Sequence, residues 1–496
     1  MPDCPIHLIS ISSYNESATI RHLFSYQLME QYNYKKTQQW RFQIMSNLKL
    51  KWFSSTEQAP WTEREVPEPQ AAGAENTAAA NLTFTGDTYQ TLEGFGGCFN
   101  ELGFAALGHL PDDERAKVMY SLFHPEGEQR FSICRLPIGA SDYALDWYSL
   151  NETDGDYAME HFSIERDRKL LIPYIKEALA LNPELRLFAS PWSPPTWMKF
   201  PKAYNYGTLR WEPEILAAYA LYFVKFVEAY RAEGITIHQV HVQNEVVADQ
   251  KFPSCVWTGE QLKIFIRDYL GPAFEEHGLE TEIWLGTINA PEPWDEWLKK
   301  KSSDHDAFAG VVLGDPGAYK YVKGVGYQWA GKHAIQRTVQ SYPELRYMQT
   351  ENECGDGENT WFYAKYIFGL YQHYFMNGVN AYIYWNMALE PKGRSTWGWE
   401  QNSMLTIDPS AKQVIHNPEY YVMKHFSRFA SPGSVRAGIR GPWSGHAVAF
   451  RTPEGERVLV ISNPYKEVRM LHLGSGSDQY SLPLEAESFH TFVLGE

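Results

Sequence analysis

Short apolar runs alternate with longer amphipathic segments over most of the 496-residue chain. The apolar runs have the length of buried strands. Eight such strands are expected, at residues 90–97, 131–139, 185–193, 238–245, 282–289, 324–329, 346–351 and 381–388. Between them, apolar residues recur at three- and four-residue spacing, which predicts helices that include residues 112–123, 165–181, 213–234 and 259–278.

This alternation predicts an α/β fold, a parallel (β/α)8 or TIM barrel over residues 84–430. A doubly wound open sheet is the alternative, and it would need a glycine fingerprint at the first turn from strand to helix. The segment GFGGCFN after the first strand is rich in glycine but lacks the GxGxxG spacing. The barrel is therefore the preferred prediction.

Both ends of the chain have a different character. From about Ser431 the sequence consists of short strands separated by turns, which predicts an all-β domain over residues 431–496. The strand LKLKWFSS near residue 50 has no place in the barrel, and the Pro- and Ala-rich residues 66–80 read as a linker. We expect residues 45–83 to add a strand to the C-terminal sheet, so that both ends build one smaller domain.

The first 44 residues are polar and show no clear period. We expect residues 1–44 to be a non-native or disordered leader, with Met45 as the true start. The N-terminus lacks the basic stretch followed by an apolar stretch that marks a secretion signal. No apolar run is long enough to span a bilayer. These features predict a cytoplasmic protein that is not integral to a membrane.

Charge and cysteine content narrow the classes of function. The net charge of −16 argues against nucleic-acid binding through a basic surface. The five cysteines include no CxxC pair, which argues against a disulfide scaffold and a zinc ribbon. His238 and His241 lie three apart on a strand and point to opposite faces, so they do not predict a shared metal site. We expect no metal and no cofactor.

Polar and aromatic residues gather at the carboxyl ends of the expected strands, and in a parallel barrel these ends converge on one mouth. They are Arg135 and Asp142 after strand two, Trp192 after strand three, Asn244 and Glu245 after strand four, Thr350 and Glu351 after strand seven, and Trp385 and Asn386 on strand eight. Each residue alone is most simply a satisfied polar group or a packed aromatic ring. Their joint placement favours a functional site.

Two glutamates at one mouth fit the requirements of glycoside hydrolysis. One carboxylic acid protonates the leaving oxygen, and the other carboxylate attacks the anomeric carbon or activates water. Tryptophan offers an apolar platform for a sugar ring, and the 17 Trp, 31 Tyr and 26 Phe residues fit either this use or a large aromatic core. Arg, Asp and Asn side chains supply hydrogen bonds to hydroxyl groups.

Several long strings of residues make this hypothesis more specific. They are GFGGCFNELG (94–103), CRLPIGASDY (134–143), LFASPWSPPTWMK (187–199), QNE (243–245), DPGAYKYVKGVGYQW (315–329), TENE (350–353), YWNMALEPKG (384–393) and NPEYYVMKHFSRFASPGSVRAG (417–438). In these strings the chain resembles glycoside hydrolase family 30, whose best-known members are the glucosylceramidases. The resemblance extends in order over roughly residues 90–440.

The resemblance implies a retaining mechanism with specific roles for the two glutamates. Glu245 would be the general acid/base and Glu351 the nucleophile, with Asn244 bound to the 2-hydroxyl of the sugar. Glu353 is a rival nucleophile because residues two apart share a strand face. Thr350-Glu351 fits the family motif of strand seven better.

Other residues would bind substrate if the resemblance holds. Arg135 would keep Glu351 ionised while Glu245 stays protonated. The remaining candidate substrate-binding residues are Asp142, Trp192, Tyr327, Trp329, Trp385 and Asn386. The chain departs from the family pattern at two positions. Val246 replaces the usual proline after Asn-Glu, and Ala330 lies close to the position where many relatives have a tyrosine that contacts the nucleophile.

The expected function is therefore that of a retaining β-glycosidase acting on a β-D-glucoside, in the manner of a glucosylceramidase. Endo-β-1,6-glucanase and β-xylosidase are alternatives within the same family, and a transglycosylase would share the covalent intermediate. A non-catalytic sugar-binding protein on a degenerate barrel is an alternative of a different class, but both glutamates are present. The expected partner is a small-molecule or lipid-linked β-glycoside.

Overall fold

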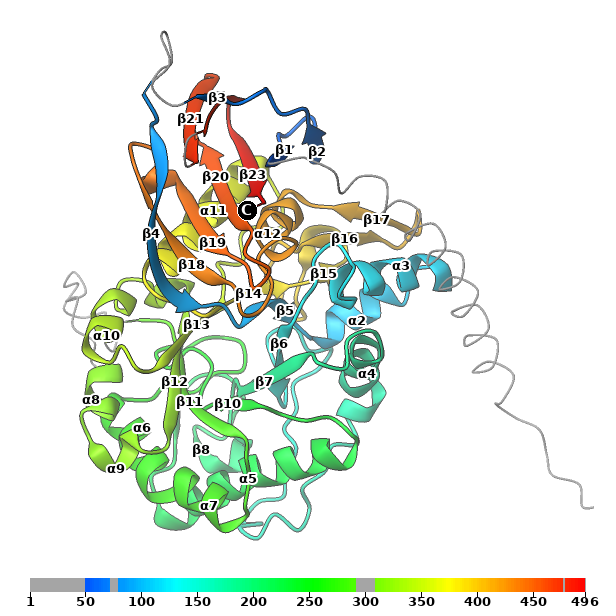
Figure 1. The fold of residues 1–496 in the computed structure, drawn as a ribbon. Helices are drawn as coiled ribbons and strands as arrows, with labels where there is room; N and C mark the ends of the chain where they lie inside the picture. Colours follow the sequence, from blue (N-terminus) through cyan, green and yellow to red (C-terminus); the bar gives the residue numbers. More distant parts are fainter. Residues whose placement is uncertain (1–49, 72–78, 291–307, 476–477, 496) are drawn as a thin grey trace, which may run out of the picture. The chain divides into compact units, whose positions relative to one another are not determined.

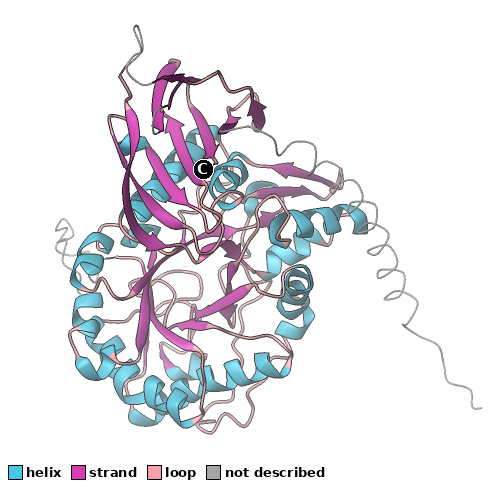
Figure 2. Ribbon diagram, in the orientation of Figure 1, coloured by secondary structure: helices cyan, strands magenta, loops and turns pink. Residues whose placement is uncertain are grey.

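The computed structural model describes residues 50–71, 79–290, 308–475 and 478–495. The expected leader, residues 1–44, and the expected start at Met45 lie outside the described residues. The described chain from Leu50 onward is one compact unit that contains a closed barrel and a ten-stranded sheet (Figures 1 and 2).

Eight parallel strands close the barrel. In order around it they are β5 (Gly94–Cys98), β6 (Ile133–Ile138), β7 (Arg186–Pro191), β10 (Gln239–His241), β11 (Glu282–Ile288), β12 (Val322–Gln328), β13 (Arg346–Glu351) and β14 (Ala381–Asn386). Each expected strand overlaps one of these, and the prediction of a (β/α)8 barrel is confirmed.

The first barrel strand begins later than expected. Residues 90 and 91 end strand β4 (Leu82–Thr91), which belongs to the ten-stranded sheet, and β5 begins only at Gly94. Gly94 has a φ of +142°, which L side chains rarely adopt, and a Cβ atom there would lie 1.8 Å from the Ser132 hydroxyl oxygen. Only glycine fits this bend. The apolar pattern continues through this bend, so the sequence did not predict the break between β4 and β5.

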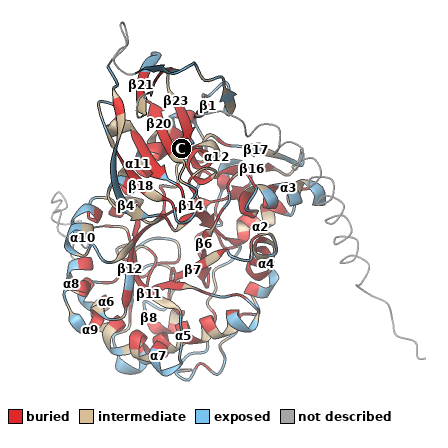
Figure 3. Ribbon diagram, viewed as in Figure 1, coloured by how far each residue is buried: buried red, intermediate tan, exposed pale blue. Residues whose placement is uncertain are grey.

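Helices surround the barrel strands, with buried inner sides and exposed outer sides (Figures 1 and 3). They are α2 (Glu101–Leu107), α3 (Asp112–Phe123), α4 (Leu171–Leu181), α5 (Pro213–Ala232), α6 (Gly259–Phe265), α7 (Gly271–Glu276), α8 (Ala309–Leu313), α9 (Pro316–Tyr319), α10 (Ile335–Ser341), α11 (Trp361–Met376) and α12 (Pro418–Ser427). Local signals set their starts: Thr258 and Gln261 form a capping box at α6, and the Thr360 side chain accepts a hydrogen bond from the Tyr363 amide at α11. None of the described helices is long and apolar enough to cross a bilayer.

The interior of the barrel is packed with side chains. A cluster of buried apolar residues from five of the strands fills it, comprising Ile133, Phe188, Trp284, Met348, Ala381 and Ile383. His241 also lies inside, stacked 5.3 Å from the Trp284 ring, and burial lowers its pKa well below the usual range. His238 is only half-buried and accepts a hydrogen bond from the Leu187 amide. The two histidines therefore occupy different environments, as their spacing predicts.

The ten-stranded sheet is built from both ends of the chain. Its strands, in spatial order, are β2 (Thr62–Arg64), β1 (Leu50–Ser55), β23 (Ser488–Leu494), β20 (Arg457–Asn463), β19 (Ala447–Arg451), β18 (Val435–Arg440), β4, β21 (Arg469–Ser475), β22 (Asp478–Leu484) and β3 (Gln70–Ala71). Strand β1 pairs antiparallel with β23, so that Trp52 lies opposite Phe492. The predicted side domain with contributions from both termini is confirmed.

One buried histidine joins this sheet to α12, and a second lies within the sheet. His425 on α12 hydrogen-bonds the Thr491 hydroxyl through Nδ1 and the Ser55 hydroxyl through Nε2, each at 2.8 Å. His490 on β23 accepts a hydrogen bond from Trp52 Nε1 at 3.0 Å. Burial lowers the pKa of His490 to about 3 and that of His425 well below its usual range. Both side chains are therefore neutral in the folded protein near pH 7.

The buried histidines predict a loss of stability in mild acid. A histidine titrates near pH 6.5 in the unfolded chain, so acidification below this value favours the unfolded state, which binds the extra proton. We expect His490→Gln to reduce the slope of the free energy of unfolding against pH, between pH 6 and 4, by up to about 1.4 kcal/mol per pH unit. Urea unfolding of both proteins across this range measures the slope, and equal slopes would contradict the assignment.

Candidate active site

Most of the predicted site residues meet at the carboxyl-terminal mouth of the barrel, around Arg135; Tyr327 does not. This side chain is fully buried at the middle of β6. Its Nη1 donates to Glu351 Oε2 at 2.5 Å, and its Nη2 donates to Asn244 Oδ1 at 2.6 Å. Nε and Nη2 also donate to the Ser190 hydroxyl, at 3.1 and 2.8 Å. Charge-assisted bonds of this kind are short and directional. Arg135 thus links the ends of β7, β10 and β13.

Aromatic rings line the site beside this arginine. The rings of Trp192 and Trp385 stack with their centroids 5.3 Å apart. The Arg135 guanidinium lies 4.4 Å from the Trp192 ring centroid and 5.6 Å from that of Trp385. Tyr143 meets Trp385 edge-to-face at 6.2 Å. The structure thus brings both tryptophans together with Arg135.

Hydrogen bonds fix the orientation of the residues on β14. Gln401 Oε1 accepts from both Trp385 Nε1 and Asn386 Nδ2, each at 2.9 Å. Asn386 Oδ1 accepts from Asn100 Nδ2 at 3.0 Å. Asn386 is fully buried, and its amide is used within the protein. Asn386 therefore helps to hold the Trp385 ring, because both side chains donate to Gln401.

Glu245 is held in a strained conformation. Its φ of +50° is uncommon for a residue other than glycine and costs on the order of 1–3 kcal/mol. Regular strand β10 ends at His241, before the Asn-Glu pair, and not at 245 as expected. The backbone amide of Glu245 donates to the Thr287 hydroxyl at 3.3 Å, and that hydroxyl donates to Asn244 Oδ1 at 3.3 Å. The surrounding bonds maintain this orientation of the carboxyl group.

The two glutamates have different electrostatic surroundings. Burial, with the charge of Glu351 as a second cause, raises the pKa of Glu245 to about 7. Burial also raises the pKa of Glu351, but the adjacent Arg135 guanidinium opposes this through its charge and its hydrogen bond. The first proton taken up by the pair therefore goes to Glu245, which leaves Glu351 ionised.

Asp142 adds a third carboxyl group to the site. Burial is the largest cause that raises its pKa, followed by the charges of Glu351 and Glu245. Its Oδ1 atom is buried and has no hydrogen-bond partner among the described residues. A buried acceptor in this state is unusual and favours a role in binding a ligand.

Gln328 is a site residue that the sequence analysis missed. It ends β12 and is fully buried, and its carboxamide lies close enough to Glu245 and Glu351 to lower the pKa of each, although neither of its polar atoms has a hydrogen-bond partner among the described residues. It lies two positions before Ala330, where a tyrosine partner of the nucleophile was expected from the family pattern. Strand alternation would have placed Gln328 inside the barrel together with Gly326 once the register was known.

Tyr327 does not join this group, contrary to expectation. As the neighbour of Gln328 on the strand it faces the outside of the barrel, where its hydroxyl contacts Thr338 Oγ1 at 2.5 Å beneath α10. Trp329 lies just past the strand in the short helix η4 (Trp329–Gly331), half-buried and 5.3 Å from the Lys332 amino group. Trp329 thus lies at the barrel mouth, whereas Tyr327 lies outside the barrel strands, beneath α10.

Glu353 lies in a different environment from Glu351. Strand β13 ends at Glu351, and Glu353 follows in the loop. Burial and the nearby Glu353 carboxylate raise the pKa of the Tyr366 hydroxyl. Arg135, by contrast, contacts Glu351. The geometry favours Glu351 as the reactive carboxylate.

A second group of aromatic residues, also missed, lies further out. Phe252 packs against the buried cluster that includes Trp192 and Trp385. It meets Trp397 at a centroid distance of 5.4 Å, and Trp397 meets the exposed ring of Trp399 at 5.2 Å. The Lys251 amino group lies 5.0 Å from the Trp397 ring centroid. We name Lys251, Phe252, Trp397 and Trp399 the outer wall; it continues the aromatic surface outward from the inner site.

The fold and this pair of carboxyl groups define a glycoside hydrolase. A family model described as the glycosyl hydrolase family 30 TIM-barrel domain matches residues 92–430, and one described as the family 30 beta sandwich domain matches residues 433–492. The chain therefore belongs to glycosyl hydrolase family 30, and the resemblance seen in the sequence is confirmed.

Relatives within this family differ in their substrates. The chain is 28% identical to "Lysosomal acid glucosylceramidase" of Mus musculus, over 76% of this chain and 76% of the relative. It is 26% identical to "Endo-1,6-beta-D-glucanase" of Neurospora crassa, over 82% of this chain and 85% of the relative. The crystal structure of SrfJ from Salmonella typhimurium covers 90% of this chain and 100% of its own, with a TM-score of 0.80 and 26% identity.

The electrostatic coupling of the pair can be measured directly. Because the charge of Glu351 helps to raise the pKa of Glu245, we expect Glu351→Gln to lower that pKa by about one unit or more. Nuclear magnetic resonance of protein labelled with 13C at the glutamate carboxyl groups reports the titration. Glu353→Gln is the matched control and should leave the titration of Glu245 in place. An unchanged pKa in Glu351→Gln would rule out the coupling.

Proposed function

We propose that the protein is a retaining β-glycosidase that hydrolyses β-D-glucosides through a covalent glycosyl-enzyme. Glu351 is the nucleophile and Glu245 the general acid/base. The observation that carries this proposal is the contrast between the two carboxyl groups: Arg135 hydrogen-bonds Glu351 at 2.5 Å, while burial and the charge of Glu351 raise the pKa of Glu245 to about 7.

In the first step, the ionised Glu351 attacks the anomeric carbon and the bond to the leaving oxygen breaks. Glu245 gives its proton to that oxygen, so that a neutral alcohol departs. Formation of the glycosyl ester removes the negative charge of Glu351. Because that charge is one cause of the raised pKa of Glu245, the pKa of Glu245 then falls. The spent acid thereby becomes a suitable base for the second step.

In the second step, Glu245 takes a proton from water while the water oxygen attacks the anomeric carbon. The bond between the sugar and Glu351 breaks, and Glu351 leaves as a carboxylate beside Arg135. Arg135 holds the same contact at the start and at the end of the cycle, so little reorganisation is needed. Asn244 lies against Arg135 in a place suited to the sugar 2-hydroxyl.

We propose that the remaining inner residues bind the sugar. Trp192 and Trp385 offer ring faces and edges to its C–H groups, and the unpartnered Oδ1 of Asp142 accepts a bond from a hydroxyl. Trp329 borders the mouth. Asn386 acts through Trp385, and Tyr327 is left out because its hydroxyl is used beneath α10.

For the leaving group, we propose a small-molecule or lipid-linked aglycone, as in glucosylceramide. The glucosylceramidase relatives support this, and the outer wall supplies an apolar surface next to the inner site. An endo-β-1,6-glucanase is the second candidate, because the same rings would stack on a further sugar and a relative has that name. The four described cysteines are free, which supports a reducing compartment such as the cytoplasm.

The assignment of the nucleophile predicts a defined rescue experiment. We expect Glu351→Ala to lose activity on 4-nitrophenyl β-D-glucoside by several orders of magnitude, because no covalent intermediate forms. Added azide should restore 4-nitrophenol release and yield a glycosyl azide of inverted anomeric configuration. Glu353→Ala is the control and should retain activity. Full activity in Glu351→Ala, with loss and azide rescue in Glu353→Ala, would reverse the assignment.

A panel of substrates distinguishes the candidate functions. Aryl β-glucoside, β-xyloside and β-galactoside, glucosylceramide in detergent, and β-1,6-glucan should be compared with native protein and Glu351→Gln. We expect release from the β-glucosides that is absent in the variant. Turnover of β-1,6-glucan alone would favour the glucanase. The absence of turnover on every substrate would favour a sugar-binding protein.

The position of Gln328 predicts a shift in the pH profile. Its carboxamide lowers the pKa of both glutamates, so Gln328→Leu should raise both. The low-pH limb of kcat/KM, which requires ionised Glu351, and the high-pH limb, which requires protonated Glu245, should both move to higher pH. The exposed Gln340→Leu on α10 serves as a control. A fall in rate with an unmoved profile would show that Gln328 has no electrostatic role.

A further inference from the structure

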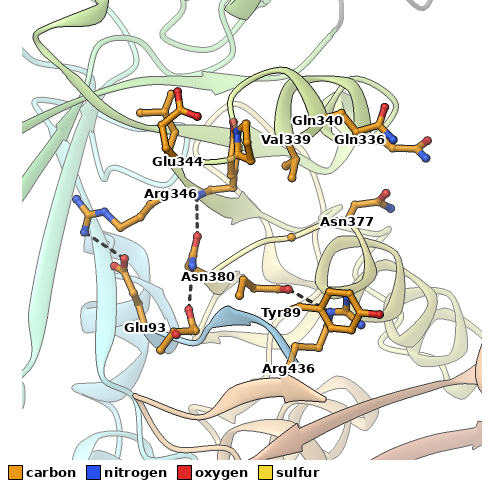
Figure 4. Close-up of a pocket in the computed structure, with 16 residues that line it drawn as sticks. Tyr89, Glu93, Gln336, Val339, Gln340, Glu344, Arg346, Asn377, Asn380 and Arg436 are labelled. Atoms are coloured by element: carbon orange, nitrogen blue, oxygen red, sulfur yellow. Dashed lines mark hydrogen bonds and ion pairs between the residues drawn. The ribbon is translucent and has the colours of Figure 1, made fainter. Parts of the chain in front are cut away.

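A groove of about 750 Å³ lies at the amino-terminal end of the barrel (Figure 4). It is lined by Glu93, Arg346 and Asn380, which lie at or just before the starts of β5, β13 and β14. Glu351 ends β13 and Glu245 follows β10, both at the opposite end of the barrel. In TIM barrels, residues at this amino-terminal face usually contribute to the stability of the barrel, and active sites lie at the other face. The groove is therefore separate from the catalytic mouth.

Two walls of different chemistry face each other across the groove. Gln336 and Gln340 lie one helical turn apart on α10, and both are exposed. On the other wall, Tyr89 of β4 is 50% exposed and Arg436 of β18 lies against its ring (Figure 4). Asn377, which follows α11, also lines the groove. We name this groove the Arg436 groove.

Arg436 is a buried cation without an anionic partner. It is only 6% exposed, yet none of the carboxylates in the described parts of the chain forms an ion pair with it. Its Nε donates to the neutral Gln90 Oε1 at 3.1 Å, its Nη1 lies 3.6 Å from Met376 Sδ, and its guanidinium carbon lies 3.6 Å from the Tyr89 ring centroid. Burial lowers the pKa of Arg436, and only Tyr89 counters this.

Arg346, in the same groove, shows the usual arrangement. It pairs with Glu93 at 3.1 Å and with Glu282 at 2.5 Å. Arg436 instead uses Nε for Gln90 and Nη1 for Met376, and none of its hydrogen bonds to described residues uses Nη2. Gln90 is itself fixed by bonds from its amide nitrogen to the Phe375 and Val379 carbonyl oxygens, at 2.7 and 3.1 Å. The guanidinium is thus presented to the groove by a rigid support, and a buried charge is costly unless it is paired.

We propose that the Arg436 groove is a second ligand site, which binds a small anionic molecule that carries hydroxyl groups, such as a phosphorylated or carboxylated sugar. The anionic group binds the Nη2 side of Arg436, and the hydroxyl groups bind the carboxamides of Gln336, Gln340 and Asn377. The exposed face of Tyr89 contacts the apolar face of the ring. The volume falls within the usual range for small-molecule sites, about 300–1,000 Å³. This site does not depend on the proposed glycosidase activity.

Calorimetric titration with defined probes tests the proposal. The probes are glucose 6-phosphate and glucuronate, with glucose as the uncharged control. We expect saturable binding of at least one anionic probe, at least tenfold tighter than any binding of glucose. Arg436→Gln should weaken it at least tenfold, whereas Arg469→Gln, which removes another arginine stacked on a tyrosine of the same sheet, should not. Binding of only one anionic probe identifies the group as phosphate or carboxylate.

Three outcomes would overturn the proposal: no saturable binding of either anionic probe, equal binding of glucose, or equal binding by Arg436→Gln. If that variant fails to fold, as judged by circular dichroism, hydrogen exchange of the native protein decides. The anionic probe should then slow exchange in residues 87–91, 336–346 and 434–438. Slowed exchange only around Glu245 and Glu351 would place the probe in the catalytic mouth and overturn the proposal equally.

Discussion

The hydrogen bonds of one buried guanidinium, that of Arg135, organise the whole catalytic mouth. It is fixed on β6 and contacts Ser190 of β7, Asn244 after β10 and Glu351 of β13. Removing one partner of such a buried charge typically costs about 3–5 kcal/mol. The loops that follow these strands can therefore vary in sequence while the relative positions of the inner residues stay fixed.

The same cation separates two chemically identical side chains. Glu351 is in direct contact with it, while Glu245 is held on a strained backbone and has a raised pKa. Gln328 lies close enough to both to lower the pKa of each, in a region where a tyrosine partner was expected near Ala330, and its own side-chain polar atoms have no hydrogen-bond partner among the described residues. A carboxamide can donate to one carboxylate and accept from a protonated one. It can thus serve both charge states of the pair by changing the group that it presents.

The sequence predicted the barrel well because each of its strands is a short apolar run at a regular interval. It also predicted which polar and aromatic residues gather at one end of the barrel, since they stand at one end of each apolar run. It could not assign Tyr327 and Gln328 correctly, because neighbouring residues on a strand face opposite sides and the choice depends on register. The Arg436 groove could not be predicted from the sequence for a different reason. Its lining residues Tyr89, Gln340 and Arg436 come from segments far apart in the chain.

Pairing of β1 with β23 has a consequence for synthesis of the protein. Leu50 lies opposite Leu494, so one edge of β1 finds its partner only when the last strand has been made, whereas β2 can pair with the other edge early. At about 5–20 residues per second, the ribosome needs on the order of half a minute to a minute and a half to cover that interval. The barrel can close during this time, while Trp52 and the unpaired edge of β1 remain exposed to other nascent chains. Chaperone binding to this strand would shorten that exposure.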